Sequence, residues 1–173
     1  DPHDADAVAA LLPDVNVTLK YENGTQSVYL NGKDLGDRIR TPEMSMYASA
    51  VSAIPAVRAF LLETQREIAR KNSVIMDGRD IGTTVFPNAE MKVFVTASAE
   101  VRAQRRYDEL TARGDKPDFR EILDNVLQRD HIDQTREVSP LRQADDALLL
   151  DNSNLTREEQ MEWLIEKFNN ITK

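Results

Sequence analysis

Cysteine is absent from the 173-residue sequence, which excludes a disulfide framework and thiol chemistry. The sequence also lacks an apolar run long enough to cross a bilayer, and no signal peptide is visible. These absences together predict a cytoplasmic protein.

Basic residues are fewer than acidic ones, 22 against 30, so the formal net charge is −8. That balance, together with an aromatic content of only 6%, argues against a surface that coats nucleic acid. The basic residues are unevenly chosen, with 15 arginines against 7 lysines, and eight of the arginines lie between residues 102 and 142. Arginine binds phosphate or carboxylate through two parallel hydrogen bonds, whereas lysine offers a point charge. The cluster therefore indicates a discrete anionic ligand, although surface ion pairs on helices are the simpler interpretation for any single arginine.

The pattern of apolar residues predicts an α/β domain. Three short apolar runs, at 74–76, 91–96 and 147–150, are separated by segments with helical spacing. Continuously apolar strands that alternate with helices are typical of a parallel sheet covered on both faces. Helix starts are marked by three capping signals, at Ser98, at Asp118 and at Thr156 with Glu159.

Residues 15–36 do not fit that parallel sheet. They alternate polar and apolar residues around Asn23-Gly24 and Asn31-Gly32, which are strong signals for tight hairpins. This segment is predicted to be a small antiparallel sheet in an inserted subdomain. A helix over 43–52 follows, and Pro55 opens a longer helix whose stripe contains Val57, Leu61, Thr64 and Ile68.

The stretch 74–82 is the strongest candidate for a ligand site. Its apolar run is predicted to be a buried strand, and Asp77-Gly78 breaks that run and places Arg79 and Asp80 side by side. Ligands in open α/β sheets bind outside the carboxyl ends of strands. Asp-Gly is also a hairpin signal, but no strand with alternating polarity follows it. The spacing therefore favours a ligand loop over a hairpin.

Several motifs in this order make the sequence resemble the bacterial cytidylate kinases over most of its length. The motifs are Asp77-Gly-Arg-Asp-Ile-Gly-Thr-Thr-Val-Phe-Pro87, Lys92-Val-Phe-Val-Thr-Ala-Ser-Ala-Glu100, Arg105-Arg106-Tyr107, Arg129-Asp-His-Ile-Asp-Gln-Thr-Arg136, Pro140-Leu141, Ala144-Asp-Asp-Ala147 and Leu150-Asp151. The resemblance implies a parallel-sheet nucleoside monophosphate kinase core. It also implies an inserted nucleotide-binding subdomain at 14–56 and a lid region at 101–117, with the core formed by 1–13, 57–100 and 118–173.

The resemblance also implies a reaction and a set of site residues. The reaction is ATP-dependent phosphorylation of CMP and dCMP, which calls for positioning and charge neutralisation. Arg79 would hold the acceptor phosphate, while Asp80, Arg58 and Ser49 would read the cytosine edge. Arg129 and Asp133 would hold the sugar, and Arg136 would lie near the transferring phosphates. Arg105 and Arg106 would be lid arginines that close over ATP.

One departure from the family pattern concerns ATP itself. The family begins with a strand and a phosphate loop of the form G-x-x-x-x-G-K-[ST], and no such motif occurs among the six glycines here. The resemblance therefore implies that roughly fifty residues precede this segment in the family's fold. Mg²⁺ is expected with ATP, but no ligand for it is assigned in this chain.

Two other classes of function remain open from the sequence alone. The absence of the phosphate loop permits a nucleotide-binding module without catalysis. An arginine-rich nucleic-acid binder is disfavoured by the net charge. The expected partners are small nucleotides rather than nucleic acid or membrane, and a monomer is predicted for the intact full-length protein.

Overall fold

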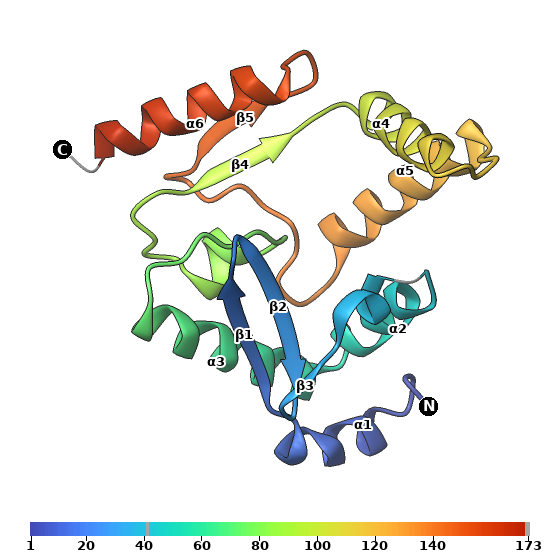
Figure 1. Ribbon diagram of the computed structural model, residues 1–173, viewed down its shortest axis with the longest axis vertical. Coiled ribbons are helices and arrows are strands. Elements are labelled where there is room, and N and C mark those ends of the chain that lie inside the picture. Colours follow the sequence, from blue (N-terminus) through green and yellow to red (C-terminus); the bar gives the residue numbers. More distant parts are fainter. Residues whose placement is uncertain (41, 172–173) are drawn as a thin grey trace. The chain divides into compact units, whose positions relative to one another are not determined.

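The computed structural model describes residues 1–40 and 42–171, apart from the side chains at positions 40, 42, 43, 45, 46 and 49. It divides into two compact units, Asp1–Val74 and Ile75–Lys173, which are described separately below (Figure 1). The predicted α/β class, with one parallel and one small antiparallel sheet, is confirmed. The boundaries drawn from the resemblance for insert, lid and core stay a prediction.

The first unit begins with helix α1 (Ala5–Leu11), whose amino end is capped by the Asp4 carboxylate, and continues through the short turn η1 (Leu12–Asp14). Its antiparallel sheet consists of β1 (Val17–Glu22), β2 (Thr25–Leu30) and β3 (Lys33–Asp34). Both connections are two-residue turns, and Asn23, Gly24, Asn31 and Gly32 all have positive φ. Asn-Gly tolerates that conformation, so these dipeptides fix the register of the hairpins.

Helices complete the first unit. After η2 (Gly36–Arg40) come α2 (Pro42–Ser52) and α3 (Pro55–Lys71), which contact one another. Pro55 occupies the first turn of α3, where its missing N–H is not needed. Val57 is buried as expected, whereas Leu61 is 39% exposed, so the inward face of α3 is narrower than the predicted stripe.

The expected strand at 74–76 is not formed. These residues have no regular secondary structure, and Ile75 is fully exposed. A strand is held by main-chain hydrogen bonds to a neighbour, and none of the described strands pairs with this segment. The hairpin alternative is also wrong, because the residues after Arg79-Asp80 form the single turn of π-helix η3 (Ile81–Val85).

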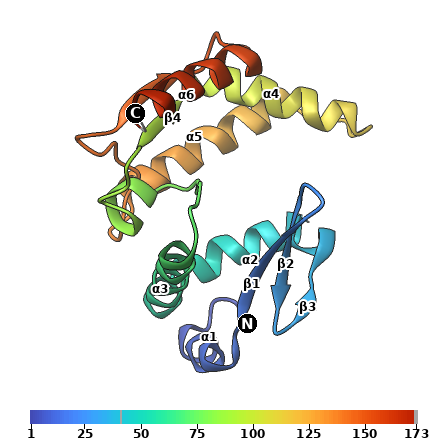
Figure 2. The same ribbon diagram turned by 60° about the vertical axis from the view of Figure 1, so that its left-hand side comes forward.

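The parallel sheet of the second unit consists of β4 (Val93–Thr96) and β5 (Leu148–Asp151), paired from Val93↔Leu148 to Thr96↔Asp151. Between these strands the chain forms α4 (Ala99–Ala112) and α5 (Phe119–Thr135), which lie side by side, and α6 (Arg157–Ile171) follows β5 (Figure 2). The three predicted caps are present, since Ser98, Asp118 and Thr156 each accept a hydrogen bond from a main-chain N–H in the first turn of the helix that follows. Glu159 completes a reciprocal capping box by accepting from the Thr156 N–H.

The most buried side chains of the second unit include Val85, Ala97, Ala103 and Leu150. They lie in or next to η3, β4, α4 and β5. Among the described helices, none has both the length and the apolar character needed to span a membrane.

Candidate functional site

The centre of the candidate site is an ion pair between Arg79 and Asp133. The Arg79 Nε donates to the Asp133 Oδ2 at 3.1 Å, although the two residues are 54 positions apart in the chain. Asp133 lies in the last turns of α5 with its side chain 21% exposed, whereas that of Arg79 is 49% exposed. A half-exposed guanidinium that is held through Nε can still bind a planar anion through its terminal nitrogens.

Arg136 joins the same carboxylate from just beyond the end of α5. Its Nη1 lies 3.9 Å from the Asp133 Oδ1, and its Nε donates to the carbonyl of Ser139 at 2.7 Å. Its Nη2 is buried and has no hydrogen-bond partner among the described residues. A buried guanidinium nitrogen without an acceptor is costly, so this position favours an anionic ligand.

Asp80 precedes the π-turn and organises it through its backbone. Its carbonyl accepts hydrogen bonds from the N–H groups of Thr84 and Val85, at 2.8 and 3.2 Å. A Cβ at position 78 would come within 2.8 Å of the Ile81 side chain, so a larger residue than glycine there would force that side chain to move.

Lys92 ties this turn to the sheet. Its side chain is only 6% exposed, and its Nζ donates to both carboxylate oxygens of Asp146 at 2.7 Å and to the carbonyl of Pro87. The hydrogen bond from Lys92 lowers the pKa of the Asp146 carboxyl, and burial opposes this effect. Lys92 thus connects the start of β4 with the chain that follows η3 and with the turn that precedes β5.

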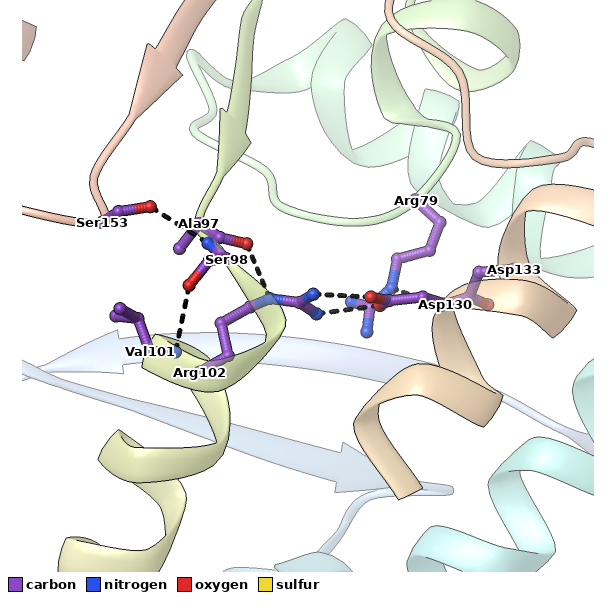
Figure 3. Close-up of polar contacts among 8 residues, drawn as sticks. All are labelled: Arg79, Ala97, Ser98, Val101, Arg102, Asp130, Asp133 and Ser153. Carbon is purple, nitrogen blue, oxygen red and sulfur yellow. Dashed lines mark hydrogen bonds and ion pairs between the residues drawn. The ribbon is translucent and has the colours of Figure 1, made fainter. Parts of the chain in front are cut away.

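A second arginine–carboxylate pair lies one helical turn from Asp133. The Arg102 Nη1 and Nη2 donate to the two oxygens of Asp130 at 2.8 and 2.5 Å, and its Nε donates to the carbonyl of Ala97 at 3.0 Å (Figure 3). The hydrogen bond from Arg102 lowers the pKa of Asp130, and the charges of Arg102, Arg79 and Arg129 lower it further against a smaller effect of burial. The same hydrogen bond raises the pKa of Arg102.

Two networks at the carboxyl ends of the strands fix the start of α4. Asp151 accepts a hydrogen bond from the hydroxyl of Ser153. The Ser153 oxygen in turn accepts from the Ser98 N–H (Figure 3). Arg105 donates to the side-chain and main-chain oxygens of Asn152 at 3.0 and 2.7 Å. Arg105 and Asn152 also line a cleft of about 270 Å³, together with residues that include Thr96, Arg102 and Asp130. The cleft lies at the carboxyl edge of β4 and β5, where α/β proteins bind ligands.

The structure brings together some of the sequence-predicted residues and not others. Arg79, Asp133 and Arg136 form one cluster, and Arg129 is exposed one turn earlier on α5. Arg106 points elsewhere, since it pairs with Glu109 on the surface of α4 at 2.7 Å, with its side chain 50% exposed.

The remaining predicted residues are Arg58 and Ser49. Arg58 is half-buried in the first turns of α3, within the first unit. Ser49 belongs to α2, and its side chain lies outside the described part of the chain. Their predicted roles at the cytosine edge stay predictions.

Sequence reasoning missed the partners of Arg102 and Lys92. A lysine inside an apolar run was a usable signal for a buried ammonium that needs an acidic or carbonyl partner. The pairing of Arg102 with Asp130 had a weaker signal, because nothing in the spacing distinguishes it from the other arginines of α4. The described residues include no group of three or more His, Cys, Asp or Glu side chains arranged to hold a metal ion.

Comparison with known proteins agrees with these motifs. The family model for cytidylate kinase matches residues 1–170. A cytidylate kinase of Bacteroides fragilis is 53% identical over 175 aligned residues, which cover the whole of this chain and 76% of that protein. Cytidylate kinases of Bacteroides thetaiotaomicron and Caldicellulosiruptor bescii are 51% and 46% identical, with 100% and 99% of this chain covered and 76% of each relative. The chain therefore belongs to the cytidylate kinase family.

Proposed function

We propose that this protein transfers the terminal phosphoryl group of ATP to CMP and dCMP. An oxygen of the acceptor phosphate attacks the γ-phosphorus, the bond from that phosphorus to the β–γ bridging oxygen breaks, and ADP leaves as CDP or dCDP forms. Family membership supports the reaction. The observation that carries the proposal is the cluster of Arg79, Asp133 and Arg136, in which a buried Arg136 nitrogen lacks an acceptor among the described residues.

Arg79 is suited to hold the phosphate of the acceptor. Its Nε is engaged by Asp133, which fixes the plane of the guanidinium. The Nη edge then meets two phosphate oxygens in parallel, which is the geometry that makes arginine selective for phosphate. Asp133 acts here as the group that orients Arg79, and its second oxygen is directed to a sugar hydroxyl together with Arg129.

Asp80 is proposed to recognise the base. A carboxylate accepts a hydrogen bond from the N4 amino group of cytosine, whereas the O4 of uracil would face it without a donor. Arg58 and Ser49 are assigned to the same edge by the resemblance alone.

The donor side of the reaction is proposed to involve Arg105, Arg106 and Arg136. Arg105 already lines the cleft at the ends of β4 and β5, and Arg136 carries the unsatisfied nitrogen. Positive groups that meet the charge of the transferring phosphoryl group stabilise the transition state and exclude water when the site closes. Mg²⁺ typically reaches such sites through ATP phosphates and one or two carboxylates, and we assign no ligand for it in this chain.

A coupled assay for ADP release, with CMP, dCMP, UMP and AMP as acceptors, tests the proposal. We expect turnover with CMP and dCMP, and a loss of CMP affinity of at least about tenfold in Arg79→Ala, because both charge-assisted hydrogen bonds to phosphate are removed. Arg70→Ala is the matched control, since Arg70 is an exposed arginine that pairs with Glu63 and Glu67 on α3. CMP affinity that is unchanged by Arg79→Ala would contradict the assignment.

The alternative of a nucleotide-binding module without catalysis makes a different prediction in the same assay. Such a module would bind CMP and would depend on Arg79, yet it would release no ADP in the presence of CMP and ATP. Measurable turnover excludes it.

A further inference from the structure

We propose that Arg102 is a positioning residue for the acceptor site: by occupying both oxygens of Asp130, it keeps that carboxylate from capturing Arg79, which then stays on Asp133. This inference rests on the proposed function, because it concerns how Arg79 is kept in place for the acceptor phosphate.

The first observation is that all three nitrogens of the Arg102 guanidinium donate hydrogen bonds, which fix its orientation. Its Nη1 and Nη2 donate to the two oxygens of Asp130, while its Nε donates to the Ala97 carbonyl at the end of β4. The two side chains are 37% and 30% exposed, so both are partly removed from water. Such a fork-to-fork pair is directional and cannot be reproduced by a lysine.

The second observation is the arrangement of the two carboxylates on α5. Asp130 and Asp133 are three residues apart, which places them on neighbouring positions of one helix face. Arg79 approaches this face, where its Nε bonds Asp133 (Figure 3). The charge of Arg79 also lowers the pKa of Asp130, so Arg79 acts electrostatically on both carboxylates.

The consequence is a competition that Arg102 decides. A carboxylate can accept several hydrogen bonds. A partly buried carboxylate that has lost its cationic partner is stabilised by a hydrogen bond from another nearby donor. If Arg102 is removed, Asp130 is left charged next to Arg79, and the attraction draws Arg79 away from Asp133 and from the phosphate. If the charge of Asp130 is removed as well, no competitor remains and Arg79 returns to Asp133.

This mechanism separates positioning from simple support of the fold. Arg102 also joins α4 to α5 next to the sheet, while Tyr107 and Phe119 make an edge-to-face contact, with ring centroids 6.2 Å apart, between α4 and the first residue of α5. Loss of Arg102 therefore lowers stability in either case. Only positioning predicts that neutralising Asp130 restores acceptor binding, while the contact of Arg102 with the Ala97 carbonyl stays lost and the protein stays less stable than wild type.

The test is CMP affinity measured by isothermal titration calorimetry on the full chain, with the melting temperature recorded in parallel. The variants are Arg102→Met, Asp130→Asn and the double variant, with Arg113→Met as the control because Arg113 is 62% exposed and pairs with Glu109 at the end of α4. We expect Arg102→Met to weaken CMP binding by about tenfold or more, as for the loss of one charge-assisted hydrogen bond. Asp130→Asn and the control should stay within about twofold of wild type, and the double variant should recover most of the affinity while remaining less stable.

Unchanged CMP affinity in Arg102→Met, or a double variant that binds as poorly as Arg102→Met, overturns the inference. Should Arg102→Met fail to fold, Arg102→Lys serves instead, since one ammonium leaves an Asp130 oxygen available and should give a smaller loss that Asp130→Asn again repairs. The expected pattern of CMP affinities in a protein that releases no ADP would refute the proposed function but uphold this inference. Turnover together with an unchanged CMP affinity across the variants would uphold the proposed function and refute this inference.

Discussion

At the scale of single residues, the second unit pairs arginines with carboxylates in a specific order along α5. Asp130 is bound by Arg102, and Asp133 by Arg79 with Arg136 nearby. Exposed ion pairs contribute little to stability, and the pair of Arg106 with Glu109 is of this kind. The pairs on α5 differ because their members come from separate elements and are partly buried, so each fixes the geometry of a candidate ligand group.

Substitution of Asp80 should change base selectivity more than catalysis in general. We expect Asp80→Ala to reduce the preference for CMP over UMP by about tenfold or more, since a hydrogen bond to a charged acceptor is lost with CMP and an unfavourable contact is relieved with UMP. The ratio of kcat/KM for the two substrates measures this. Asp77→Ala, a change at the exposed aspartate on the other side of Gly78, is the control. A selectivity ratio that Asp80→Ala leaves at its wild-type value would rule out a role in base recognition.

The ion pair of Asp130 with Arg102 should make stability depend on pH. The pKa of the Asp130 carboxyl lies below the ordinary value of about 3.9 because Arg102 donates hydrogen bonds to the carboxylate. The folded protein therefore binds this proton less readily than the unfolded chain does, so the stabilisation is present above about pH 4 and is lost as the pH falls through the lowered pKa. The melting temperature of Asp130→Asn should lie below that of wild type at pH 7, and the gap should close toward pH 3. A gap that is constant over this range would mean that the carboxylate charge does not contribute.

At the scale of elements, the π-turn η3 contains none of the proposed site residues. It nevertheless helps to position Arg79 and Asp80, because its N–H groups donate to the Asp80 carbonyl. Its position depends on Lys92, which reaches from the start of β4 to the Pro87 carbonyl and to Asp146. A ligand loop held by a buried lysine keeps its shape through side-chain bonds, although residues 74–76 before it form no strand.

Replacement of Lys92 by methionine should destabilise the second unit and loosen this loop. The hydrogen bond to Pro87 and the pair with Asp146 are lost, while the apolar stem is kept, so we expect a cost of about 1–3 kcal/mol. Denaturant unfolding measures the free energy, and hydrogen exchange at residues 81–87 reports on the loop. Lys71→Met is the control, because Lys71 is 70% exposed and forms a surface pair with Glu67. Unfolding curves of Lys92→Met that superimpose on those of the wild type would show that the buried lysine is dispensable.

At the scale of the whole molecule, the balance of charge limits which anions can be bound. A net charge of −8 repels polyanions, while local clusters of arginine still attract a single nucleotide. The chain therefore combines an excess of acidic residues with local clusters of arginine.

Nucleotide binding should be visible as thermal stabilisation. At free CMP about a hundredfold above its Kd, linkage stabilises the folded state by about 2.7 kcal/mol, which corresponds to a rise in melting temperature of roughly 5–10 °C for a chain of this size. UMP at equal concentration should raise it less. Differential scanning fluorimetry measures both, and equal shifts with the two nucleotides would contradict selective binding of the cytosine base.

Polynucleotides should not bind at the same surface. We expect no retardation of a single-stranded RNA or DNA oligonucleotide in a gel shift at low salt, where electrostatic binding is strongest. Retardation that weakens steeply with added salt would revive the interpretation of the arginine cluster as a nucleic-acid surface.

Local chemistry in the sequence was sufficient to predict much of this protein. The Asn-Gly turns, the caps at Ser98, Asp118 and Thr156, and the proline at the start of α3 are all signals in which a residue's own conformational preference or hydrogen bonding defines the element. The motifs around Arg79 and Arg129 likewise led to the family, because a family pattern is read from the sequence itself.

Only the tertiary structure decided which charges meet. Whether 74–76 forms a strand depends on a hydrogen-bonding neighbour, and whether an arginine is a ligand group or a surface ion depends on what lies beside it in space. The sequence treats Arg102, Arg105 and Arg106 alike, yet they are bound to Asp130, Asn152 and Glu109 respectively. Residue preferences act over a few positions along the chain, whereas these pairings join segments up to 54 residues apart and form only when the fold brings them together.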